Sequence, residues 1–157
     1  MKMKTSIRRR FREEGGAAAV EFALIVGVLS LLVFGMMEYG LFFLQSQSLR
    51  AGAREGARHA AVGANLTEVK QVVSDGSAGA LPAGSSAVSM DVVGSTQTTC
   101  TTSAADDTQG KEVEVTIDTT NYGNLPNAVV QAFQIDVPFL PHVDIHPDIK
   151  GNFRCEL

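Results

Sequence analysis

The sequence offers little of what enzymes and metal-binding proteins require. Its 157 residues include only two cysteines, Cys100 and Cys155. Neither cysteine has a second cysteine or a histidine at metal-ligand spacing, which argues against a zinc site. The chain also lacks a glycine-rich phosphate loop and a serine-nucleophile motif. We therefore expect no enzymatic activity, no bound metal and no cofactor.

Positive charge is scarce in the second part of the chain. Residues 61–157 contain four Lys/Arg against twelve Asp/Glu, whereas residues 1–60 contain nine Lys/Arg against five Asp/Glu. This asymmetry argues against nucleic acid as a partner of the acidic part. It indicates a basic, membrane-proximal end followed by an acidic soluble end. The length allows one small domain and an anchor, but not two sizeable cores.

A long apolar run begins shortly after the basic N-terminus. Sixteen uncharged residues separate Glu21 from Glu38, and the apolar character resumes after Glu38 as far as Leu44. A bilayer core of about 30 Å needs about 20 helical residues. Residues 17–44 are therefore predicted to form a transmembrane helix, with Glu38 near one membrane face. The alternative is a cleaved secretory signal, but the apolar part of such a signal is only about 7–15 residues long.

The charges that flank this run predict its orientation. Six Lys/Arg precede the run and three arginines follow it, which places the N-terminus in the cytoplasm. The acidic end would then be exported, and a disulfide between Cys100 and Cys155 would stabilise it by about 4 kcal/mol. On the cytosolic side the two cysteines would instead remain thiols.

The junction between the basic leader and the apolar run resembles the processing site of type IV pilin precursors. It reads Arg-Arg-Arg-Phe-Arg-Glu-Glu-Gly-Gly over residues 8–16 and continues as Ala-Ala-Ala-Val-Glu from Ala17 to Glu21. In such precursors a prepilin peptidase cuts after the glycine, so the resemblance implies cleavage between Gly16 and Ala17. Glycine lacks a side chain and interrupts a helix, which would let the leader unwind there.

The resemblance also implies a role for Glu21, which becomes the fifth residue of the mature chain. A carboxylate at the centre of a bilayer costs about 2.5–3.5 kcal/mol unless a partner neutralises it. In assembled pilins that partner is thought to be the freed α-amine of a neighbouring subunit, which would fix the axial register. The alternative is that Glu21 lies at headgroup depth as a simple boundary charge.

Three segments of the chain carry a family resemblance. They read Gly-Ala-Ala-Ala-Val-Glu-Phe-Ala-Leu over residues 16–24, Gly-x-x-Glu-Tyr-Gly over residues 35–40, and Ala-Gly-Ala-Arg-Glu-Gly-Ala-Arg over residues 51–58. These segments resemble the TadE-like family of minor pseudopilins, which belong to the tight-adherence (Tad/Flp) pilus, a type IV pilus system. Phe22 stands where the major pilin has tyrosine, which favours a pseudopilin over a main filament subunit.

This family resemblance implies a function, a location and partners. The protein would take part in assembling or priming the pilus. It would be a single-pass protein of the bacterial inner membrane, with a cytoplasmic N-terminus and a periplasmic head, and it could be incorporated in the extracellular pilus. The implied partners are the prepilin peptidase, other pilins and pseudopilins, the inner-membrane assembly platform and the lipid bilayer.

Two kinds of residue recur every four positions along the predicted helix. The small residues are Ala19, Ala23, Gly27, Gly52 and Gly56, and the basic residues, here called the basic stripe, are Arg50, Arg54 and Arg58. Small residues let helices approach closely in lipid, so this set is predicted to contact other pilin helices. Glu21 and Glu38 are predicted to set the axial register of these helices during assembly. The basic stripe is predicted to contact lipid phosphates or acidic groups of a neighbouring subunit, or else forms a solvated face.

The remaining sequence predicts a stem and a small head. The helix that begins at Ala17 is expected to continue to Ala61, and a second short helix is expected at residues 66–73 with Asn65 or Thr67 as its cap. We therefore assign residues 1–16 to the leader, 17–44 to the transmembrane helix, 45–74 to an extramembrane helical stem and 75–157 to the head.

The head is predicted to contain a small antiparallel sheet. Apolar residues alternate with polar ones at 88–92 and at 113–117, and a third strand is expected near 149–155. A helix could start at Pro126, and Pro138 would end it. The expected fold class is therefore α+β, a long N-terminal helix with a pilin-like β-rich head.

A second interpretation is a membrane-tethered periplasmic binding module, in which the helix serves only as an anchor. The head offers one alternating set of potential ligands, His142, Asp144, His146 and Asp148. An extended backbone would place them on one face. However, two neighbouring prolines make this segment irregular, so we interpret the four residues as exposed loop side chains.

Overall fold

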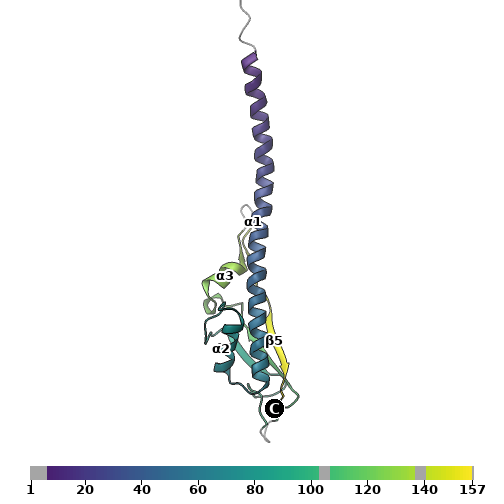
Figure 1. The fold of residues 1–157 in the computed structure, drawn as a ribbon, viewed down its shortest axis with the longest axis vertical. Helices are drawn as coiled ribbons and strands as arrows, with labels where there is room; N and C mark the ends of the chain where they lie inside the picture. The colour runs from purple at the N-terminus through teal and green to yellow at the C-terminus, as the bar shows by residue number, and fades with distance from the viewer. Residues whose placement is uncertain (1–6, 103–106, 137–140, 157) are drawn as a thin grey trace, which may run out of the picture.

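The computed structural model describes residues 7–102, 107–136 and 141–156, and it shows one long helix with a small head packed on its C-terminal part (Figure 1). This helix, α1, runs from Ile7 to Ala61. It passes through Gly16 without the break that we expected there. The neighbouring residues are rich in arginine, glutamate and alanine, whose helix propensity offsets the cost of about 1 kcal/mol for each glycine.

α1 has a bare part and a part that is covered by the head. Among the described residues it is the one helix long and apolar enough to cross a membrane, and its most apolar stretch is not buried by the protein at all. Contact with the head is established at Phe42, whose ring centroid lies 5.8 Å from that of Phe133. Farther along, Leu49, Ala53 and Ala57 are completely buried.

The main sheet contains the three strands that we expected, two of them from the alternating pattern. They are β1 (Val88–Val92), β2 (Glu112–Ile117) and β5 (Ile149–Arg154). All pairs are antiparallel and the spatial order is β1-β2-β5. The apolar residues of β1 and β2 are buried, because they share one face of the sheet and that face packs toward α1.

The second helix, α2, runs from Leu66 to Gly76 and lies beside α1. Asn65 is its cap: the Asn65 side chain accepts a hydrogen bond from the Glu68 backbone at 3.0 Å, and the Glu68 carboxylate accepts one from the Asn65 backbone at 3.1 Å. This capping box satisfies two backbone donors that the helix start would otherwise leave unpaired. The helix extends beyond the predicted Val73, and Gln71 donates to Asp75 along its last turn.

The helix expected after Pro126 is short. α3 runs from Asn127 to Phe133 and follows a 3-10 turn, η1 (Tyr122–Asn124). It ends before Pro138, which lies outside the described residues. The chain then forms two strands that the sequence did not predict, β3 (Gln134–Ile135) and β4 (Val143–Asp144). Each has only two residues, so no alternating pattern could reveal it.

A disulfide joins Cys100 to Cys155, with their Cα atoms 5.6 Å apart. It ties the connection between β1 and β2 to the end of β5, as the sequence predicted. Both cysteines are buried, and the backbone N–H of Cys155 donates to the carbonyl of Lys111 at 2.8 Å. The bond therefore closes the end of the head that is farthest from the bare part of α1.

Candidate functional surface of the long helix

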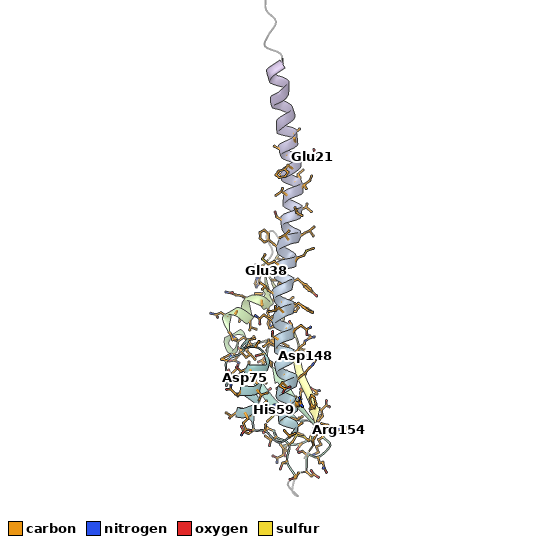
Figure 2. All side chains as sticks on the ribbon, in the orientation of Figure 1. Glu21, Glu38, His59, Asp75, Asp148 and Arg154 are labelled. Atoms are coloured by element: carbon orange, nitrogen blue, oxygen red, sulfur yellow. A yellow bond between two sulfur atoms is a disulfide. The ribbon has the colours of Figure 1, made fainter. Side chains whose placement is uncertain are left out.

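The two membrane-region glutamates occupy different environments on α1. Glu21 is exposed on the bare part of the helix, whereas Glu38 is partly buried where the head begins (Figure 2). The two positions are seventeen helical steps apart, which corresponds to about 25 Å along the axis. The two carboxylates therefore cannot form one site within a single chain. Neither has a cationic partner among the residues that the structure describes.

The five small residues fall into two groups that the sequence could not separate. Ala19, Ala23 and Gly27 are exposed, and a Cβ added to Gly27 would meet nothing within 4 Å. This row is open to another helix. Its predicted contact with other pilin helices stays a prediction.

Gly52 and Gly56, by contrast, are buried against α2 of the same chain. An added Cβ at Gly52 would lie 2.6 Å from the carbonyl oxygen of Val73, and one at Gly56 would lie 2.5 Å from the Val73 side chain. Val69 and Val73 recur at the same spacing of four on α2 and form the matching ridge. Helices with matching rows of residues can pack together, but a spacing of four does not by itself identify the partner helix.

The basic stripe lies on a face of α1 that the head leaves uncovered. Arg50, Arg54 and Arg58 are all exposed, and no carboxylate of the described residues pairs with them. Successive guanidinium groups are offset by about 6 Å along the helix axis. The arrangement suits an extended row of anions supplied from outside the chain. The expected contact, with lipid phosphates or with acidic groups of a neighbouring subunit, stays a prediction.

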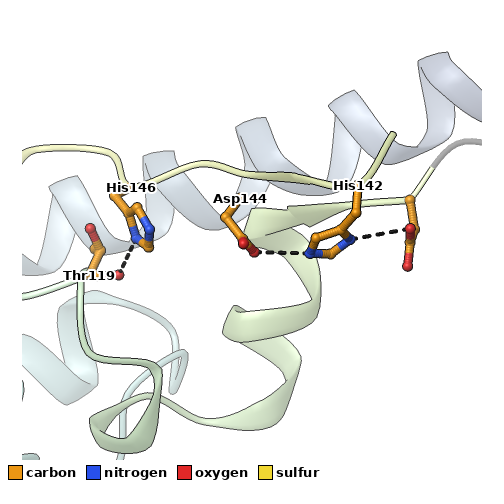
Figure 3. Close-up of polar contacts among 5 residues, drawn as sticks. Thr119, His142, Asp144 and His146 are labelled. Carbon is orange, nitrogen blue, oxygen red and sulfur yellow. Dashed lines mark hydrogen bonds and ion pairs between the residues drawn. The ribbon is translucent and has the colours of Figure 1, made fainter. Parts of the chain in front are cut away.

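Three members of the alternating His/Asp set, His142, Asp144 and His146, do not converge on one point (Figure 3). The two ring nitrogens of His142 hydrogen-bond to Asp136 at 3.2 Å and to Asp144 at 3.1 Å, while His146 bonds to the carbonyl oxygen of Thr119 at 2.9 Å. A histidine that donates from both nitrogens has no lone pair for a metal. Among the described residues no three His, Cys, Asp or Glu side chains are placed as ligands of one ion.

The hydrogen bond to Asp136, followed by the one to Asp144, raises the pKa of His142 above its usual value. The two hydrogen bonds therefore stabilise the folded protein fully at pH values below the pKa of His142 in the unfolded chain. Their contribution to stability is lost as the pH rises through the higher pKa of His142 in the folded protein.

We expect an NMR titration of the His142 ring to show this raised pKa. Asp136→Asn should lower it, while Asp148→Asn, which removes a carboxylate that does not contact His142, should leave it unchanged. A pKa of His142 that is equal in all three proteins would contradict this assignment.

Residues 16–58 match the model of the family described as TadE-like protein. The match confirms the resemblance that the sequence shows over this segment, and it includes Glu21, Glu38 and the whole basic stripe. No curated protein and no solved structure matches the chain. The matched segment lies entirely within α1, so the helix and not the head carries the family likeness.

Proposed function

We propose that this chain is a minor pseudopilin that takes part in assembling or priming a Tad pilus. The match of residues 16–58 to the TadE-like family model supports the proposal. The observation that carries the proposal is the bare part of α1. It exposes the carboxylate of Glu21 and a row of small residues on an apolar helix that the head does not cover. A helix that served only as an anchor would need neither feature.

The proposed mechanism begins with cleavage between Gly16 and Ala17 by a prepilin peptidase. The freed helix would then pack against the helices of other pilins, pseudopilins and the inner-membrane assembly platform. Glu21 would pair with the α-amine of a neighbouring subunit and so set the axial register. This role is structural and requires no catalysis by the protein itself.

The proposed location is the bacterial inner membrane, with the N-terminus in the cytoplasm and the head in the periplasm. The excess of positive charge before the apolar run supports this orientation. The disulfide between Cys100 and Cys155 supports it independently, because disulfides persist in the oxidising periplasm and are rare in the cytosol.

The test compares the wild-type protein with Glu21→Ala in cells that contain the peptidase and the rest of the pilus system. Mass spectrometry is expected to find Ala17 as the first residue of both proteins. Pili are expected to be lost in Glu21→Ala although the protein remains inserted, because only the assembly function needs the carboxylate. Val28→Ala, which trims an exposed apolar side chain of the same helix, serves as the matched control and should retain pili.

Two results would contradict the proposal separately. A mature protein that still begins at Met1 would refute the processing step. Normal piliation in Glu21→Ala would refute the role of the carboxylate and would favour the tethered binding module. That alternative also predicts that an unrelated transmembrane helix can replace residues 17–41 without loss of function, whereas the assembly mechanism predicts that this exchange abolishes pili.

A further inference from the structure

The part of α1 between Glu21 and the head is only as long as a bilayer core is thick. The segment from Phe22 to Leu41 contains twenty residues, which as a helix measure about 30 Å and equal the thickness of a bilayer core. The next residue, Phe42, already packs edge-on against Phe133 of α3. If α1 spans a bilayer with Glu21 at one face, the head begins at the other face.

The part of the head at this level is formed by α3 and the strands that follow it. Figure 1 shows α3 at the end of the head that lies nearest the bare part of α1. The backbone N–H of Ile145 donates to the carbonyl of Phe133 at 2.9 Å, and β4 pairs with β3 through Val143 and Ile135. Val143 is therefore fixed to the same end of the head as the contact between Phe133 and Phe42.

Apolar side chains are exposed at this end of the head. Val143 is 45% exposed, and on α1 the side chains of Tyr39 and Phe43 flank Phe42 and are 62% and 52% exposed. We call Tyr39, Phe43 and Val143 the membrane-proximal edge. Aromatic residues concentrate where a helix leaves the hydrocarbon core, so the two aromatic members suit an interface between lipid and water.

We propose that the membrane-proximal edge rests on the lipid surface, so that the head docks on the bilayer. The occupant is lipid because the edge is continuous with the exposed apolar surface of α1, which lipid surrounds. The carboxylates of Asp136 and Asp144 are both bonded to His142, which limits the negative charge beside Val143. The surface therefore suits zwitterionic headgroups. This inference rests on the proposed membrane-spanning role of α1.

The opposite end of the head provides an internal reference. The helix from Phe42 to Ala61 measures about 30 Å. The C-terminal chain meets its far end, where the N–H of Glu156 donates to the carbonyl of Ala61. Val93 lies at this end as well, because its N–H donates to Glu112, whose cross-strand partner is Arg154 near the C-terminus. Val93 is 54% exposed and thus matches Val143 in residue type and exposure.

The absence of tryptophan from the chain allows a direct test. Three single-tryptophan variants of the full chain, Leu32→Trp, Val143→Trp and Val93→Trp, are placed in phosphatidylcholine vesicles whose acyl chains carry bromine at a shallow or a deep position. Bromine quenches only tryptophan that contacts the lipid. We expect deep bromine to quench Leu32→Trp and shallow bromine to quench Val143→Trp, while Val93→Trp keeps its fluorescence with both lipids.

The three variants separate failure of this inference from failure of the membrane-spanning role. Loss of fluorescence in Leu32→Trp but not in Val143→Trp would overturn docking and leave the span intact. Absence of quenching in Leu32→Trp would overturn the span itself. If Val143→Trp is shielded from aqueous acrylamide but not quenched by lipid, protein and not lipid covers the edge, which also overturns the proposal. Equal quenching of Val143→Trp and Val93→Trp by brominated lipid would show that the head has no fixed orientation relative to the bilayer, which would also overturn the proposal.

Discussion

Replacing Cys100 with serine is expected to lower the free energy of unfolding of the head by about 4 kcal/mol. The bond to Cys155 closes a loop with a sequence separation of 55. Loss of the bond raises the conformational entropy of the unfolded chain, which favours unfolding. A head of this size has a small core, and a change of this magnitude is a large fraction of the stability of a typical domain. Chemical denaturation of the full chain in detergent, followed by far-UV circular dichroism, measures the difference.

The control is the double variant Cys100→Ser/Cys155→Ser. A reductant should destabilise the wild-type protein to about the level of this variant and should have no further effect on the variant itself. Equal midpoints of denaturation for the oxidised and the reduced wild-type protein would contradict the expected contribution of the bond.

Gly151→Ala is expected to destabilise the head by about 3 kcal/mol, at the upper end of the cost of overpacking a core. Gly151 lies on β5 where that strand crosses α1, and an added Cβ would collide with the carbonyl of Ala53 and come within 2.6 Å of the backbone nitrogen of Arg54. These are backbone atoms of a long helix, so they cannot rotate aside as a flexible side chain could. The strand or the helix must shift instead.

The matched control for Gly151→Ala is Asn152→Ala on the same strand. Asn152 is exposed on the outer face of the sheet, so its replacement should change the stability only slightly. Thermal unfolding of both variants is the measurement. A melting temperature of Gly151→Ala equal to that of Asn152→Ala would show that β5 does not press on α1 as closely as the structure indicates.

The sequence predicted the features whose pattern is local. Alternation of apolar and polar residues identified β1 and β2, and the expected end of α1 at Ala61 is confirmed. Two potential caps, Asn65 and Thr67, indicated the start of α2, and the structure shows that Asn65 is the cap. In each case a single element determines the pattern, so no knowledge of the tertiary partner was needed.

The sequence could not predict features that depend on a partner distant in the chain. The spacing of Gly52 and Gly56 equals that of Ala19 and Ala23, yet α2 covers the first pair only. The residues next to Gly151 in the sequence do not indicate its contact with Ala53. Similarly, the position of Phe42 near the end of the apolar run suits an aromatic residue at a membrane interface. Only the fold shows that Phe42 packs on Phe133. These contacts follow from how the head wraps α1.

The last strand of the chain completes the core around the first helix. β5 is an edge strand of the sheet that packs on α1 and ends at the disulfide. Contacts between distant parts of a chain form slowly, because the loop between them must close first. During synthesis α1 therefore emerges long before β5 can cover Ala53. Under the proposed topology the head can reach its final fold only after β5 and Cys155 have crossed the membrane, so its maturation cannot precede their export.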